Sequence, residues 1–348
     1  MAVKHRSEHH PLAPITWVRS PWWDSCWFLS APLLGLLMLV PLVVPLPTAE
    51  ISAGIIVLRF AHAISSIVLA WSHRGYRQVM LTNRPKFIGV PALVMLLGLL
   101  VGIGTWLLFP AFNPFRYFFV EKLASDSFVI PLVSLTGVYT VWNLYHGGRQ
   151  NFGFLCLYRG RGFTRWQRTY VVWRFRFTVP WQKVLVSLAC VLVTIFVVQE
   201  LKGLVAFKAV GPFCPGSDTL NHCVTAGLKS NDPRFMIVKV VGLFCFGFVT
   251  VNHYLAAIGL AAHIHARHFK CSPMAFVGST LFVGIWLAFA FFIAMYHSIP
   301  WFDVALGLSL SLGLWHFLQD RWTFRFSDPQ VRATIGRDLR GRPIMAAA

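Results

Sequence analysis

Long apolar runs, separated by short polar or basic segments, dominate the pattern of this chain. Eight of these runs are long enough to cross roughly 30 Å of hydrocarbon as a helix. They lie at residues 27–46, 50–72, 87–109, 128–146, 184–201, 235–263, 274–297 and 302–319. The pattern predicts an all-α protein, a polytopic membrane helix bundle with about eight transmembrane helices.

Composition supports the membrane class and bears on the partners. Of the 348 residues, 56% are hydrophobic and only 12% are charged, which leaves too little polar surface for an ordinary soluble domain. A net charge of +19 is also typical of proteins that bind nucleic acid. Here, however, the Lys and Arg residues lie in the connections between apolar runs, so we expect membrane lipids and no nucleic acid as partners.

The distribution of Lys and Arg predicts the orientation of one integral-membrane domain, residues 1–348, in the inner (plasma) membrane. The segments 1–26, 147–183 and 321–348 are basic, whereas the first and seventh connections contain no Lys or Arg. Positive charge favours the cytoplasmic side, so both termini are expected there and the loop 202–234 outside. Run 27–46 lacks a cleavage site and is expected to be a retained helix, not a signal peptide.

Two connections have features of their own. Residues 147–183 mix arginines with Trp and Tyr, as in Arg165 and Trp166, which is typical of a segment lying in the headgroup layer. The alternative is a lid or a docking surface over an active site. In the exterior loop, Cys214 and Cys223 are the only two cysteines close enough in a polar segment to suggest a disulfide.

Histidines recur near one end of the even-numbered apolar runs, the end that the charge pattern places inside. Metals in helix bundles are held by side chains from facing helices, so these histidines are candidate metal ligands. The expected ligands are His73, His146, His263, His265 and His316. A histidine at a helix end is also common as an interfacial or capping residue, which is the simpler interpretation of each one taken singly.

A second set of polar residues lies deeper in the apolar runs. Arg59 and His62 are one helical turn apart, and His253 lies at a similar depth in the sixth run. Ionisable groups at membrane depth are costly and indicate a functional site, so these three are candidate cofactor-binding residues. For the two histidines, a hydrogen bond within the core is the alternative.

Polar residues one turn from two of the histidines are candidate catalytic groups. Asp320 follows His316 by four positions, and Gln150 follows His146 by four. That spacing places each pair on one helix face, where the second residue can bind or orient. Arg149 is a third candidate catalytic group. The glycine pair before it is expected to end the helix, which would allow the Arg149 side chain to face the site.

The ligand types favour iron. The histidines are too numerous for one tetrahedral zinc, and carboxylates are too few for a Glu-rich di-iron bundle, so we expect non-haem iron as a di-iron centre. The layout of histidines at the expected cytoplasmic ends of several transmembrane helices resembles that of the polyhistidine membrane oxygenases, desaturases and hydroxylases and the Brp/Blh-type carotene-cleaving dioxygenases. The resemblance is in layout alone, because the segment from His263 to His268 is not the spaced histidine box of the desaturases and His316 is followed by Asp320 where a second histidine would stand. This resemblance implies an oxidoreductase with a lipid or isoprenoid-like hydrophobic substrate and an electron donor.

Two other functions remain open on the sequence. In a b-type cytochrome, His62 with His253 and His73 with His263 would hold haem between paired imidazoles, and Arg59 would bind a propionate. In a transporter, the layer of Arg59, His62 and His253 would form the midplane site. Metal content and an optical spectrum would separate these functions.

Overall fold

The structure is a computed structural model that describes residues 17–44, 48–108, 141–143, 145–151, 153–154, 233–296 and 302–323, with positions 169, 172–173, 183, 187 and 331. Every regular element in these ranges is a helix, in agreement with the all-α prediction. In chain order the elements are α1 (Pro21–Trp27), α2 (Ala31–Leu37), the 3-10 helix η1 (Val40–Leu42), α3 (Thr48–Ser72), α4 (Arg74–Thr82), the π-helix η2 (Pro85–Gly89), α5 (Val90–Leu108), α10 (Pro233–Cys245), the π-helix η5 (Phe246–Val251), α11 (Asn252–Phe269), α12 (Pro273–Tyr296) and α13 (Phe302–Thr323).

Four helical stretches in the described part of the chain are long and apolar enough to cross a membrane. They are Ala53–Ser72, Pro85–Gly104, Val240–Phe269 and Pro273–Ile293. The pair Pro21–Trp27 and Ala31–Leu42, bent by 44°, makes a possible fifth. Several apolar helices are therefore compatible with a membrane protein, while the number eight is not confirmed.

The remaining expected spans differ from the structure in instructive ways. Run 27–46 is interrupted near Ser30, because Pro32 occupies the first turn of a new helix. Runs 128–146 and 184–201 lie largely outside the described residues, as do the cysteines at 214 and 223 and most of segment 147–183. Helix α13 is the eighth expected run, but it is less apolar than the four stretches and buries several polar side chains, namely Ser309, Ser311, His316, Gln319 and Asp320.

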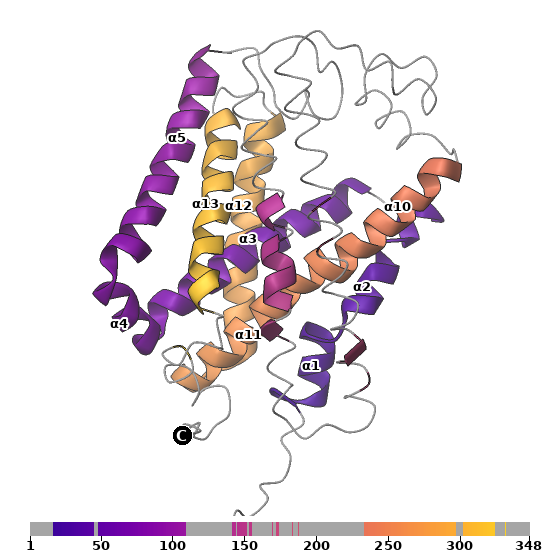
Figure 1. The fold of residues 1–348 in the computed structure, drawn as a ribbon, viewed down its shortest axis with the longest axis horizontal. Helices are drawn as coiled ribbons and strands as arrows, with labels where there is room; N and C mark the ends of the chain where they lie inside the picture. Colours follow the sequence, from indigo (N-terminus) through magenta and orange to yellow (C-terminus); the bar gives the residue numbers. More distant parts are fainter. Residues whose placement is uncertain are drawn as a thin grey trace, which may run out of the picture.

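Helix α3 is the central element of the bundle. It packs against α11, α12 and α13, and Figure 1 shows it running obliquely past the more upright α12 and α13. Gly284 of α12 allows a close approach, because a Cβ atom there would lie 2.8 Å from the carbonyl oxygen of Val57. Small residues at such crossings are typical of membrane helix packing.

The outer faces of two helices are strongly apolar. On α12, Phe282, Trp286 and Phe289 are more than half exposed, and their spacing of three to four residues places them on one face. On α5, Leu93 and Leu100 are similarly exposed and seven residues apart. A soluble protein rarely leaves such continuous apolar surface uncovered, whereas lipid would cover it without cost.

Candidate metal centre

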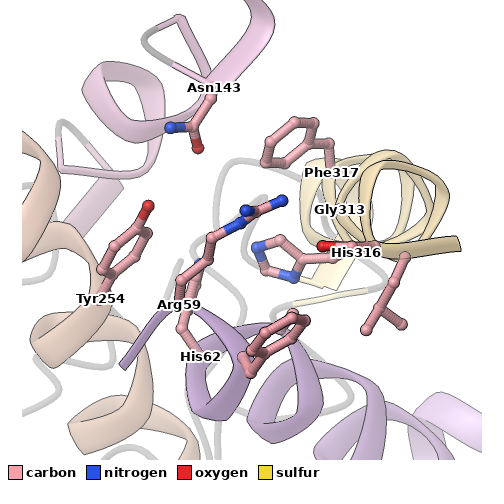
Figure 2. A pocket seen from close by; sticks show the side chains of 11 residues that line it. Arg59, His62, Asn143, Tyr254, Gly313, His316 and Phe317 are labelled. Carbon is pink, nitrogen blue, oxygen red and sulfur yellow. The ribbon is translucent and has the colours of Figure 1, made fainter. Parts of the chain in front are cut away.

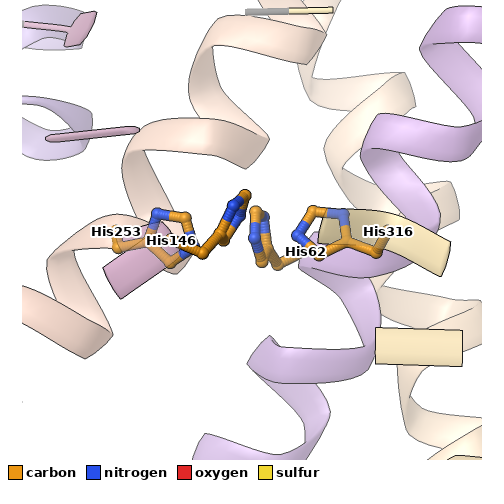
Figure 3. A group of neighbouring side chains, drawn as sticks. All are labelled: His62, His146, His253 and His316. Carbon is orange, nitrogen blue, oxygen red and sulfur yellow. The ribbon is translucent and has the colours of Figure 1, made fainter. Parts of the chain in front are cut away.

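Four buried histidines from four separate segments meet inside the bundle. They are His62 of α3, His146 of the helical segment 145–151, His253 of α11 and His316 of α13. One ring nitrogen from each lies within 4.8 Å of the corresponding atoms of the other three. Figure 3 shows the four rings between their helices, and none is more than 7% exposed.

The rings contact one another edge to face. The centroid of the His62 ring lies 4.2 Å from that of His316 and 4.4 Å from that of His253. The His146 centroid lies 5.0 Å from that of His253 and 5.1 Å from that of His316. The closest pairs, His62 with His316 and His62 with His253, contact each other directly, whereas the centroids of His62 and His146 are 6.4 Å apart.

The ring nitrogens of the group make few hydrogen bonds to the protein, although Nε2 of His146 and Nε2 of His316 lie beside the Asp320 carboxylate. Both nitrogens of His62, His253 and His316, and Nε2 of His146, are buried without a hydrogen bond. A buried polar atom left unsatisfied costs about 1–3 kcal/mol, so a cluster of such atoms needs a physical reason. Binding a cation through their lone pairs is the reason that fits four convergent imidazoles.

The geometry is close to that of a metal site. Imidazole nitrogens bind first-row metals at about 2.0–2.1 Å, so two ligands on opposite sides of one ion are about 4.2 Å apart. The four ring nitrogens lie within 4.8 Å of one another, so two opposite rings would each need to move inward by only a few tenths of an ångström. The group could therefore hold a metal ion after a small inward movement of the side chains.

Asp320 supports two of the four histidines. Its Oδ2 atom lies 3.3 Å from Nε2 of His316 and 3.5 Å from Nε2 of His146. The same oxygen accepts a hydrogen bond of 2.6 Å from Nε2 of Gln150. Carboxylates beside metal-binding imidazoles fix ring orientation and raise ligand basicity, so the geometry suits Asp320 for a positioning role, with Gln150 holding its carboxylate.

A π-helix precedes His253 in the chain. The wide turn η5, Phe246–Val251, comes directly before α11, so His253 follows it by two residues. The side-chain amide of Asn151 donates to the carbonyl oxygen of Val249 at 3.0 Å, which satisfies one acceptor of the wide turn. Such turns occur frequently at functional sites because they change which face of a helix a residue occupies.

A small pocket opens beside His62 and His316. Arg59, Asn143 and Tyr254 also line it, and it has about the room of one water molecule. Figure 2 shows the Arg59 guanidinium directed into this space next to the His316 ring. The deep residues Arg59, His62 and His253 thus join with His146 and His316 in one region of the bundle.

The other expected ligands lie elsewhere. His73 is 11 residues after His62 on α3 and its ring centroid is 4.1 Å from that of His268, so it belongs to a separate group at the ends of α3 and α11. His265 of that helix end lies near Cys271, with 3.6 Å between Nδ1 and Sγ. His263 is about 15 Å from His253 along the helix axis.

The division of the expected ligands has a physical cause. Grouping the histidines by their depth along each apolar run assumes that all helices stand upright. Figure 1 shows that α3 runs obliquely, and an oblique helix brings residues of different apparent depth together. The convergent group of four histidines lies near the middle of the runs Ala53–Ser72 and Val240–Phe269, whereas metal binding by His73, His263 and His265 stays a prediction. Arg149 is exposed, and its catalytic role stays a prediction.

Several residues of the site were not expected from the sequence. Asn143 and Tyr254 line the pocket, and the Phe317 ring centroid lies 4.6 Å from that of His146. Two of these could have been found from the sequence by their distance from a predicted site histidine. Tyr254 adjoins His253, and Asn143 precedes His146 by one helical turn. Phe317 looked like any other apolar residue of its run.

Comparison of the chain with protein-family models, with curated proteins and with solved structures found no match. The assignment of function therefore rests on the residues and their geometry.

Proposed function

We propose that this protein is a membrane-embedded oxidoreductase that uses a histidine-bound iron ion and acts on a lipid or isoprenoid-like substrate. The observation that carries the proposal is the convergence of four buried imidazoles with unpaired nitrogens. Neutral imidazole suits iron, copper and zinc, but four imidazoles would fill a tetrahedral zinc site. With six-coordinate iron, two positions remain for reactants.

The chain's own residues would provide the environment for this chemistry. Asp320 and Gln150 hold the rings of His146 and His316, and Phe317 packs against both rings and shields them from water. When bound, iron supplies the one-electron and oxygen chemistry that these side chains lack. We propose one ion in place of the expected pair, because the four ligands surround a single point.

The setting supports a hydrophobic substrate. The centre lies among helices whose outer faces are apolar, such as α12 with Trp286 and Phe289 exposed. A lipid or isoprenoid chain dissolved in the bilayer would reach the bundle from the side. The proposal includes an electron donor, an inner-membrane location and cytoplasmic termini, all of which follow from the charge pattern and the chemistry.

The test is metal analysis and spectroscopy of the full chain purified in detergent under anaerobic conditions. About one non-haem iron per chain, together with substrate-dependent oxygen uptake in lipid or carotenoid extracts, is the expected result. A Soret band would instead identify a haem protein. Absence of any bound metal would overturn the proposal and leave transport as the better hypothesis.

A further inference from the structure

The pocket between Arg59 and two of the four histidines, His62 and His316, has the features of a binding site for a small anion. It is lined on one side by His62 and His316, which carry the unpaired nitrogens, and on another by the Arg59 guanidinium. The Arg59 guanidinium and these two histidines of the candidate metal centre thus line the same pocket, which has room for about one water molecule. Figure 2 shows this arrangement, with Asn143 and Tyr254 at the opposite wall.

The charges around this space favour an anion. Arg59 lies close enough to His316 for the two side chains to interact electrostatically. A divalent ion on four neutral imidazoles would add two further positive charges within the same weakly polar region. The Asp320 carboxylate contacts His146 and His316, and no carboxylate is among the described residues that line the pocket.

The other polar lining groups are neutral and suited to a small ligand. Asn143 carries an amide, Tyr254 a phenol and Ser309 a hydroxyl, and each can donate a hydrogen bond. An anion in the pocket would therefore meet a cation and donors on one side and the metal on the other. Binding between two fixed positive centres away from bulk water is electrostatically strong.

We propose that this pocket is the exchangeable ligand position of the metal centre and that it selects small anions, with Arg59 as the residue that confers the selectivity. The inference rests on the proposed metal centre and adds the chemical class of the ligand that shares it. Reduced oxygen species, hydroxide and a substrate carboxylate oxygen all belong to that class.

The experiment is a fluoride titration of the full chain loaded with cobalt(II), followed in the visible spectrum, where cobalt reports on its ligands; fluoride is close to a water molecule in size. The wild type should bind fluoride, and Arg59→Gln should bind the same amount of cobalt but bind fluoride about 10- to 100-fold more weakly, because a charge-assisted hydrogen bond is lost. Arg59→Lys, which keeps the charge, should restore most of the affinity. Arg84→Gln, which removes an exposed cation just after α4, is the matched control.

The outcomes separate this inference from the metal centre itself. A protein that binds no cobalt overturns both proposals. Cobalt binding without any fluoride response in the wild type, or an unchanged fluoride affinity in Arg59→Gln, overturns only the anion site. If Arg59→Gln does not fold, Tyr254→Phe takes its place, with an expected loss of several-fold in fluoride affinity; unchanged affinity in that variant would overturn the site.

Discussion

The side-chain amide of Gln150 donates a hydrogen bond of 2.6 Å to the Asp320 carboxylate, across 170 positions of sequence. Both residues are buried, with 6% and 3% of their surfaces exposed. This bond ties the segment that carries His146 to the helix that carries His316. His146 and His316 are thereby joined through the Asp320 carboxylate that lies beside both rings, and the consequences can be measured.

Substitution of a single central ligand should remove the metal. For His253→Ala we expect the metal content to fall to near zero, since three imidazoles in a weakly polar cavity bind much more weakly than four. The measurement is metal per chain in purified protein. His268→Ala, at the separate group beside His73, is the control and should retain full metal content. Equal losses in both variants would contradict the assignment of the centre.

Asp320→Asn should weaken metal binding without abolishing it. Loss of the carboxylate charge behind His146 and His316 removes an orienting partner, which typically costs about 10- to 100-fold in metal affinity. Competition against a chelator would give the affinity. The neighbouring exposed Arg321→Gln should have wild-type affinity. A tightly bound metal in Asp320→Asn would show that this carboxylate has no positioning role.

The contact between α5 and α13 should tolerate no added methyl group. A Cβ atom at Gly98 would collide with the Ser311 hydroxyl and lie 2.6 Å from the carbonyl oxygen of Gly307. Gly98→Ala is therefore expected to destabilise the fold by about 1–3 kcal/mol. Thermal unfolding in detergent is the measurement. On the same helix, Gly104 has open space around its Cβ direction, so Gly104→Ala should be neutral or slightly stabilising.

The exposed face of α12 should lie in lipid. A spin label at Trp286→Cys, in a cysteine-free background, is expected to be accessible to oxygen and protected from a water-soluble relaxing agent, because oxygen partitions into hydrocarbon. A label at Arg84→Cys should show the reverse pattern. Equal accessibility to the aqueous agent at both positions would argue against a membrane-facing α12.

The sequence predicted the helix class well because long apolar runs have few alternative structures. It also singled out all four residues of the centre, although His62 and His253 were separated from His146 and His316 by apparent depth. The true grouping depends on the oblique path of α3, and crossing angles arise from packing between distant segments. The π-helix at Phe246–Val251 could not be predicted from the sequence either, since no proline or glycine pattern requires it.

That wide turn also joins two of the histidine-bearing segments. A π-helix is wider than an α-helix, and the carbonyl oxygen of Val249 within it accepts its side-chain hydrogen bond from Asn151. Deleting one residue within Phe246–Val251 would close the wide turn into ordinary α-helical bonding and remove this acceptor. Because Asn151 lies on the segment that carries His146, the link between that segment and the helix of His253 would be lost.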